Sequence, residues 1–379
     1  MRVQVHGSID ELDAGAWNAL EGAQLPFLRH EFLAALEHSG SVAAARGWQP
    51  AYLALHDSGG LAAAAPAFVK SHSWGEFVFD FAWAQAYAHA GRDYYPKLVV
   101  ATPFTPATGA RLLVRSGPGA AARRRVLVDA LSEHAAGCGF SSVHALFIDE
   151  ADREAFAAAG WMLRRDCQFH WHNAGYHDFQ HYLGGFTAEK RKKVRRERRR
   201  VAEGGIRFET RFGGDLDRGT LDAVYAFHRD TFLRRGNEPY LTRRFFAELA
   251  AKLPDAMMVK LAVTGHGEAL AAAIFWQHPE ALYGRYWGAA ADCHSLHFET
   301  CYHQGIEFCI ERGIGRFEPG TQGEHKVARG FEPALTWSAH HIADACFRGA
   351  IDDYLRREGA AVDAFAARIE RHVPYRERR

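Results

Sequence analysis

Twelve residues, from Glu189 to Arg200, read EKRKKVRRERRR and include nine basic side chains. This block carries a charge of +7 in a chain of 379 residues with a net charge of +1, so the other residues together carry −6. Positive charge concentrated in one segment of a nearly neutral chain is typical of a surface that binds an anionic partner, and phosphate binding is the function that we expect first. A solvated surface helix without a ligand is the alternative. A nuclear-import signal is a third interpretation, which a helix in mid-chain disfavours.

The block also has the pattern of a docked helix. Residues at helical spacing form one narrow stripe that can pack on a core: Lys190, Val194, Glu197 and Val201. Thr187 is suited to cap the start of this helix, and Gly204 with Gly205 is suited to end it. The other side then presents only cations: Arg191, Lys192, Lys193, Arg195, Arg196, Arg199 and Arg200.

Histidine and cysteine are candidates for metal chemistry, because the chain has 22 histidines and six cysteines. Two sets cluster in the sequence: Cys167, His170 and His172, and then His294, His297, Cys301 and His303. Neither spacing matches a zinc finger or an H-E-x-x-H helix, so we expect no metal and interpret these histidines as hydrogen-bonded or exposed. No CxxC pair occurs, as is typical of reduced thiols in a cytoplasm.

Three segments combine glycine, proline, aromatic and charged residues in a way that is typical of loops lining a site. They are HSWGEFVFDFAWAQAY from His72 to Tyr87, YYPKLVVATPFTPATGARLL from Tyr94 to Leu113, and GTQGEHKVARGFEP from Gly320 to Pro333. For the region from His72 to Arg111, one ordered loop whose glycines and prolines direct its path is an equally acceptable interpretation.

Composition indicates a globular protein, with 48% hydrophobic and 24% charged residues. The longest apolar run, Leu61 to Val69, is short and contains Pro66, so we expect neither a signal peptide nor a transmembrane segment, and a cytoplasmic location. Periodicity predicts two mixed α/β domains of similar element order, residues 1–172 and 173–379, and the second opens with the basic helix 189–200. In each, a long helix lies between a group of strands and a following strand: residues 120–138 in the first and 296–312 in the second.

This element order is similar to the acetyltransferase fold of the GNAT superfamily, and the three loop segments resemble the FemAB-like family of predicted N-acyltransferases, also called peptidoglycan biosynthesis or recognition proteins. The resemblance covers nearly the whole chain. The basic helix also looks like the arginine-rich helix that opens the second acetyltransferase-like domain of the Fem aminoacyltransferases. HFETCYHQGIEFCIERG followed by RFEPG, from His297 to Gly320, is similar to their penultimate helix and strand. The resemblance implies tandem GNAT-like domains in an α/β fold.

It also implies an N-acyltransferase or aminoacyltransferase. Such an enzyme moves an acyl group from aminoacyl-tRNA or acyl-CoA to an amine on a small molecule or peptide, such as a cell-wall precursor. The alternative is a binding module for tRNA, or for an anionic cell-wall intermediate, that has lost its chemistry. No tightly bound cofactor is expected, and no oligomeric state follows from the sequence.

Acyl transfer to an amine needs a base and a donor to the oxyanion, and the residues offer candidates for both. Glu324 or His325 could take the proton, Lys326 or Arg329 could hold the oxyanion or another anion, and Tyr286 could donate to the leaving atom. Substrate contacts are expected from His72, Glu76, Asp80, Tyr94, Tyr95, Lys97, Thr105, Thr108, Arg111, Gln322, Lys326 and Arg329. Donor phosphates are expected at Arg191, Lys192, Arg195, Arg196 and Arg199.

Coenzyme A binding in acetyltransferases uses a Q/R-x-x-G-x-G/A loop whose N–H groups hold the pyrophosphate. In the second half that position reads GAAADCHSL, from Gly288 to Leu296, and lacks the arginine and the second glycine. In the first half RSGPGA, from Arg115 to Ala120, has glycines one position out of place, and Pro118 removes a donor. Neither loop favours acetyl-CoA, whereas an aminoacyl-tRNA donor could obtain its phosphate contacts from the basic helix.

Overall fold

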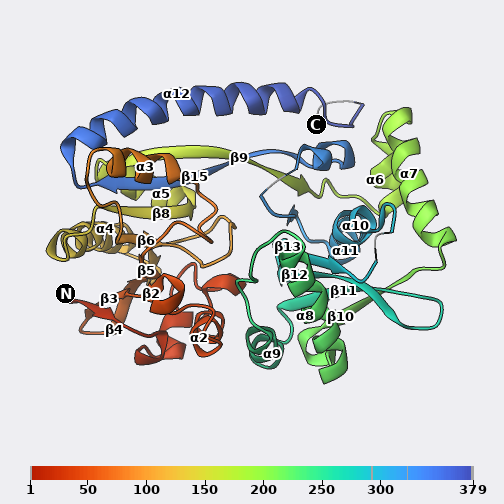
Figure 1. The fold of residues 1–379 in the computed structure, drawn as a ribbon, viewed down its shortest axis with the longest axis horizontal. Coiled ribbons are helices and arrows are strands. Elements are labelled where there is room, and N and C mark those ends of the chain that lie inside the picture. The colour runs from red at the N-terminus through yellow and green to blue at the C-terminus, as the bar shows by residue number, and fades with distance from the viewer. Residues whose placement is uncertain (1, 292, 322, 377–379) are drawn as a thin grey trace. The chain divides into compact units, whose positions relative to one another are not determined.

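The computed structural model describes residues 2–291, 293–321 and 323–376 of the chain. These residues form two compact units, and we describe each separately (Figure 1). Unit 1 lies within Met1–Asp166 and Leu335–Ala364, and unit 2 lies within Cys167–Ala334 and Phe365–Arg379. This division differs from the expected one at residue 172, because the chain after residue 334 returns to unit 1. There Trp337 to Ile342 pair antiparallel with Ile148 to Ser142.

Unit 1 contains two groups of paired strands. The first follows the order β1 (Arg2–His6), β3 (Tyr52–Asp57), β4 (Gly60–Ala65) and β7 (Leu113–Val114). The second follows the order β15 (Glu332–Ile342), β8 (Ser142–Ile148), β6 (Lys97–Val100), β5 (Ala67–Lys70) and β2 (Trp48–Pro50). The helices are α1 (Ala14–Asn18), α2 (His30–His38), α3 (Phe81–His89), α4 (Ala120–Gly137) and α5 (Glu150–Ala158), and the short 3-10 turns are η1 (Ile9–Glu11), η2 (Pro26–Leu28) and η3 (Ala44–Arg46).

Pro66 divides the longest apolar run of the chain into two strands. The structure has β4 before Pro66 and β5 after it. Proline has no N–H for a strand ladder, so the chain can change partners at this residue. Strand β4 pairs with β3 and β7, whereas β5 pairs with β6 and β2.

The strands of unit 2 follow the order β10 (Arg207–Phe212), β11 (Met257–Val263), β12 (Ala269–His278), β13 (Ala281–Ala289), β14 (Arg316–Glu318) and β9 (Met162–His172). The strands from β10 to β13 pair antiparallel, β14 pairs in parallel with β13, and β9 pairs antiparallel with β14. The helices are α6 (Phe179–Gly184), α7 (Ala188–Glu203), α8 (Arg218–Leu233), α9 (Arg243–Lys252), α10 (Leu296–Phe298), a π-helical segment η5 (Glu299–His303) and α11 (Gln304–Arg312), with 3-10 turns η4 (Gly213–Asp215) and η6 (Glu324–Arg329).

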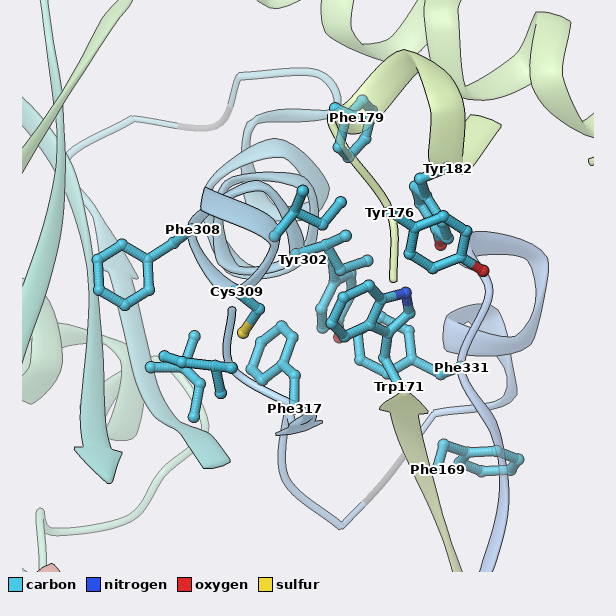
Figure 2. Close-up of a cluster of buried hydrophobic side chains, with 14 of the residues drawn as sticks. Phe169, Trp171, Tyr176, Phe179, Tyr182, Tyr302, Phe308, Cys309, Phe317 and Phe331 are labelled. Atoms are coloured by element: carbon cyan, nitrogen blue, oxygen red, sulfur yellow. The ribbon is translucent and has the colours of Figure 1, made fainter. Parts of the chain in front are cut away.

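The core of unit 2 is aromatic. Trp171 of β9, Phe317 of β14 and Phe331 lie together with Tyr302 of η5, and all four are buried (Figure 2). Gly305 on α11 allows the helix to approach β14 closely, because a Cβ there would lie 2.6 Å from the ring of Phe317. Helix α12 (Ala345–Glu370) was not expected from the sequence. Among the described residues, no helix is both long enough and apolar enough to cross a bilayer.

Gly288 on β13 allows another close approach, and its substitution tests the packing of unit 2. A Cβ at this position would lie 1.9 Å from the main-chain oxygen of Phe227 on α8. We expect Gly288→Ala to lower the free energy of unfolding by about 2–4 kcal/mol, because backbone must move to relieve the overlap. Urea denaturation measures this change. Gly265→Ala is the matched control, because nothing lies within 4 Å of its Cβ, and equal stability of the two variants would contradict the packing described here.

Candidate active site

The sheet of unit 2 opens between β13 and β14. The two strands are paired in parallel only from Ala281 to Tyr283, opposite Arg316 to Glu318. Strand β14 ends at Glu318, whereas β13 continues to Ala289. A β-bulge follows directly, because Phe275 of β12 pairs with Gly284 and Ile274 pairs with Tyr286, which leaves Arg285 as the extra residue. Bulges bend a strand and redirect its side chains, so this one contributes to the opening.

A pocket of about 110 Å³ lies at this opening. Its walls come from β12, β13, the end of β14 and the helical segment at η5, and they include Arg285, Tyr286, Trp287, His297, Cys301 and Tyr302. Burial raises the pKa of Tyr286 to about 12, so its hydroxyl stays protonated and can act as a donor at neutral pH. The π-helical turn at η5 directs Tyr302 to this pocket, and π-helical turns are frequent at functional sites.

Lys326 of η6 adjoins the pocket. Its side chain is buried, and Nζ donates a hydrogen bond of 2.6 Å to the carbonyl oxygen of Gly320, next to the pocket residue Pro319. Burial, followed by the charge of Arg285, lowers the pKa of Lys326 to about 7. The lysine therefore changes its charge near neutral pH, which is where a catalytic group is most useful.

His325 is the second titratable group of η6 at the pocket. The hydroxyl of Tyr302 and Nε2 of His325 are hydrogen-bonded at 2.9 Å. Partial burial and the charges of Lys326 and Arg329 lower the pKa of His325, so the imidazole is neutral at pH 7 and can accept a proton. The neighbouring Glu324 and His325 itself are both exposed to solvent. Of the two predicted bases, His325 is the one with a hydrogen bond to the pocket residue Tyr302, and this contact favours it.

Arg329 is not free to hold a substrate anion. Its guanidinium forms two hydrogen bonds with Glu197 of α7, of 2.6 and 3.2 Å, and stacks 3.5 Å above the ring of Phe298. Oε2 of Glu197 also lies 3.3 Å from Nε2 of His303, within hydrogen-bonding distance. Sequence reasoning placed Glu197 on the docking stripe of the helix but gave it no partner. In the structure this carboxylate ties the basic helix to the loop that carries His325 and Lys326.

The predicted stripe of α7 is confirmed at Val194, Glu197 and Val201, which are all buried, while Lys190 is partly exposed. Thr187 occupies the N-cap position, but its side chain makes no capping hydrogen bond. The predicted phosphate-binding side chains Lys192, Arg195, Arg196 and Arg199 are exposed, and Arg191 is partly exposed. Arg198, to which the sequence pattern gives no role, forms ion pairs with Glu299 at 3.1 Å and with Glu307 at 2.7 Å.

In unit 1, the charged residues predicted to contact substrate are buried and bonded to one another. Lys97 Nζ donates to Glu76 at 2.8 Å and to Asp80, and the Tyr94 hydroxyl donates to Asp80 at 2.6 Å. Burial raises the pKa of Glu76 to about 7. Burial opposes ionisation of Asp80 as well, but the adjacent Lys97 ammonium outweighs it and lowers the pKa of this carboxyl. These groups form an internal network, and their role in substrate recognition stays a prediction.

The other predicted substrate residues of unit 1 also bond within the unit. The His72 ring bonds to the carbonyl oxygen of Arg46 at 3.0 Å, and the Tyr95 hydroxyl bonds to Ser73 at 2.8 Å. Arg111 is buried and donates to main-chain oxygens, while Thr105 is buried and Thr108 partly exposed. Gln322 lies outside the described residues. Over the described ranges, no three histidine, cysteine or acidic side chains converge as metal ligands, including those of the two sequence clusters.

Comparisons with known proteins agree on the fold. FemX has a TM-score of 0.54 at 11% identity, over 93% of this chain and 100% of that one. L-PGS from Bacillus licheniformis has a TM-score of 0.53 at 12% identity, over 86% of this chain and 95% of that one. The C-terminal domain of a putative lysylphosphatidylglycerol synthetase from Agrobacterium fabrum has a TM-score of 0.54 at 12% identity, over 92% and 96%. No curated protein matches the chain in sequence.

The open sheet of unit 2 and these structural likenesses define the class of fold: the protein has a mixed α/β fold that it shares with FemX and L-PGS. The sequence profile of the FemAB-like family, described as peptidoglycan biosynthesis/recognition, matches residues 8–377. The chain belongs to this family, as the loop segments indicated. The family and its fold support acyl or aminoacyl transfer as the general type of activity.

The Glu197 carboxylate provides a test of how α7 is held. Burial acts to raise its pKa, but hydrogen bonds from His303 and Arg329 outweigh this effect and lower it. We expect Glu197→Gln to lower the free energy of unfolding at pH 7 by about 3 kcal/mol, because it leaves Arg329 buried without its counter-charge. The folded pKa is depressed, so this stabilisation is present above the unfolded pKa of about 4.3 and is lost as pH falls through the folded pKa.

Urea denaturation at pH 7 and at lower pH measures both effects, and the difference between wild type and variant should shrink on acidification. Glu203→Gln, an exposed glutamate on the same helix, is the control. A difference that is independent of pH would contradict an ionised Glu197.

Proposed function

We propose that the protein is an N-acyltransferase or aminoacyltransferase and that the pocket at the opening of the unit 2 sheet is its active site. The observation that carries this proposal is the position of His325 and Lys326 beside a pocket at the end of β14: His325 is hydrogen-bonded to the pocket residue Tyr302, and buried Lys326 is hydrogen-bonded to the carbonyl oxygen of Gly320, next to the pocket residue Pro319. Family membership supports the same reaction class. One structural neighbour is the C-terminal domain of a putative lysylphosphatidylglycerol synthetase, and this name denotes an aminoacylated product, which is consistent with the proposal.

In the proposed reaction the acceptor amine must lose a proton as it attacks the acyl carbon. In this proposal neutral His325, which is hydrogen-bonded to Tyr302, takes this proton directly or through water. Protonated Lys326, whose Nζ donates to the carbonyl oxygen of Gly320, stabilises the oxyanion of the tetrahedral intermediate. Tyr286 lines the pocket and supplies a hydroxyl donor for the leaving oxygen or sulfur. Each group acts in a protonation state that it holds near pH 7.

The donor is proposed to be aminoacyl-tRNA or acyl-CoA, and the acceptor an amine such as that of a cell-wall precursor. A binding module without catalysis, for tRNA or an anionic cell-wall intermediate, is the competing function. The exposed cations of α7 suit either function, so only a transfer assay separates them.

The first test is acyl transfer itself. Purified protein is incubated with labelled aminoacyl-tRNAs or acyl-CoAs and a panel of amines, and we expect a labelled amide product. Lys326→Met should lower kcat by about 100- to 1,000-fold, the usual effect of removing one donor to an oxyanion. Lys252→Met removes an exposed lysine of unit 2 and should leave kcat unchanged. Absence of transfer by the folded protein would favour the binding module.

The second test is the pH profile of kcat. Activity should rise as His325 loses its proton, at a pH below the usual histidine pKa of about 6.5. It should fall as pH increases through about 7, because Lys326 then loses the charge that holds the oxyanion. Lys326→Arg should keep partial activity and remove the alkaline fall, since arginine stays protonated. An unchanged alkaline limb in this variant would remove Lys326 from the proposed role.

A further inference from the structure

The β-bulge of β13 brings a cation to the candidate active site that the proposed reaction does not use. Successive residues of a strand ordinarily point to opposite faces of the sheet. Arg285, the extra residue of the bulge, and its neighbour Tyr286 nevertheless both line the pocket, because bulges redirect side chains. Arg285 is partly exposed, so a substrate in the pocket can contact its side chain.

The guanidinium group of Arg285 has a partner within the pocket wall. It is hydrogen-bonded to the side chain of Tyr286, and its Cζ lies 6.0 Å from the centre of the Tyr286 ring. A guanidinium group has five N–H donors, and a bond to one phenol oxygen occupies one of them. Its N–H groups form a planar fork that matches the two oxygens of a carboxylate. A carboxylate is therefore the ligand group that suits Arg285 best.

The surroundings of the pocket are cationic. Lys326 adjoins the pocket, and after burial the charge of Arg285 is the strongest influence that lowers the pKa of this lysine. The pocket residue His297 shows the same effect, because burial, followed by the charges of the surrounding basic side chains, lowers its pKa to about 4. Within the described ranges, the pocket lining contains no carboxylate. Like charges that share a site cost free energy, and an anionic ligand group relieves this cost.

Two buried carboxylates on the neighbouring elements are already paired with arginines. Glu318, at the end of β14, accepts from Arg316 at 2.8 Å, and Glu197 of α7 accepts from Arg329 at 2.6 Å. Glu318 also favours the charged form of Arg285. Neither carboxylate lines the pocket. They reduce the local positive charge but offer a substrate no anionic contact there.

The chemistry of the reaction indicates which substrate carries the anionic group. Cationic surroundings lower the pKa of an ammonium group and so supply the neutral amine that must attack, but they also repel an ammonium group that stands alone. A carboxylate on the neighbouring carbon offsets this repulsion, because it pairs with Arg285. An α-amino acid has this arrangement, and so has a peptide side chain that ends in an amine beside a carboxylate. The pocket volume of about 110 Å³ suits a group of this small size.

We propose that the acceptor is an amine whose neighbouring carbon bears a carboxylate, and that Arg285 determines specificity by binding this carboxylate. The inference rests on the proposed function and names the acceptor class for the same site. The amine nitrogen bonds to the acyl carbon and gives a proton to His325, while the bond from the acyl carbon to the donor oxygen or sulfur breaks. That atom takes a proton from Tyr286, which regains one from His325 through solvent. The products are an N-acyl amino acid and the free hydroxyl or thiol of the donor.

The test compares alanine with alaninamide as acceptors in the transfer assay, with the donor that supports transfer. The two molecules have nearly the same shape, and only alanine carries the carboxylate. We expect kcat/KM to be about 10- to 100-fold higher for alanine, the usual effect of a hydrogen bond to a charged group. The amine of alaninamide is the more easily deprotonated of the two, so this preference cannot come from the amine itself. Equal values, or a higher value for alaninamide, overturn the proposal.

Variants show whether Arg285 causes the preference. Arg285→Gln should abolish the ratio of kcat/KM between alanine and alaninamide, whereas Arg285→Lys should keep part of it, since lysine retains the charge but not the fork. Arg207→Gln removes an exposed arginine of β10 and should leave the ratio unchanged. A ratio that survives in Arg285→Gln, with both acceptors slowed equally, would give Arg285 a structural role and overturn its assignment.

A second measurement requires no transfer. Cys301 lines the pocket and is partly exposed, so the rate at which charged methanethiosulfonates modify it reports the local charge. Burial raises the pKa of the Cys301 thiol, which slows the anionic sulfonatoethyl and the cationic trimethylammonioethyl reagent alike. Relative to a small free thiol, we expect the anionic reagent to react about tenfold faster, and Arg285→Gln to reduce this difference. Mass spectrometry of the digested protein distinguishes Cys301 from the other cysteines, and equal relative rates contradict a cationic pocket.

The two measurements distinguish a failure of this inference from a failure of the proposed function. Transfer to alanine and alaninamide with equal kcat/KM removes the inference and keeps the function. Absence of transfer from any donor to either acceptor removes both, and the Cys301 rates then still decide whether the pocket attracts anions. If Arg285→Gln fails to fold, the comparison of the two acceptors with the wild-type protein decides the outcome.

Discussion

The buried carboxylate of Glu197 is the constraint on which the arrangement of unit 2 depends. It lies on a helix that is otherwise strongly cationic, and it bonds both Arg329 of η6 and His303 of the π-helical segment η5. One anion therefore fixes three elements: the charged surface of α7, the loop with His325 and Lys326, and the helix that bears Tyr302. A buried ion pair contributes little net stability, but it is intolerant of displacement. The contacts of Glu197 with Arg329 and His303 therefore hold these three elements in position.

The same arrangement explains why α7 can be both basic and docked. Its apolar residues Val194 and Val201 contact the core, and Glu197 supplies the counter-charge between them. Arg198 is neutralised by Glu299 and Glu307, so the inner part of the helix is electrically balanced. The net charge that remains belongs to the outer arginines and lysines. These charged side chains, whose burial would cost free energy, therefore stay in solvent, where a ligand phosphate can reach them.

The sequence predicted the helices over residues 120–138, 189–200 and 296–312, because their apolar residues recur with a strong helical period. It predicted the docked stripe of α7 for the same reason. It did not predict that Arg329 pairs with Glu197, since two residues 132 positions apart meet only through tertiary structure. It likewise gave no sign that Glu76, Asp80 and Lys97 bond to one another, because a charged residue in a sequence does not reveal its tertiary partners. The sequence pattern identifies helices and strands, whereas tertiary packing decides which charged side chains are available to a ligand.

The return of residues 335–364 to unit 1 has a consequence for how the protein is made. Strand β8 of unit 1 obtains its neighbour β15 only after the whole of residues 167–334 has been synthesised. During translation, unit 1 therefore presents an unpaired strand edge while most of unit 2 leaves the ribosome, and unpaired edges favour aggregation. Neither unit corresponds to a contiguous gene fragment. Recombination that exchanged one unit at a single crossover would leave β8 without its partner, so the two units are inherited together.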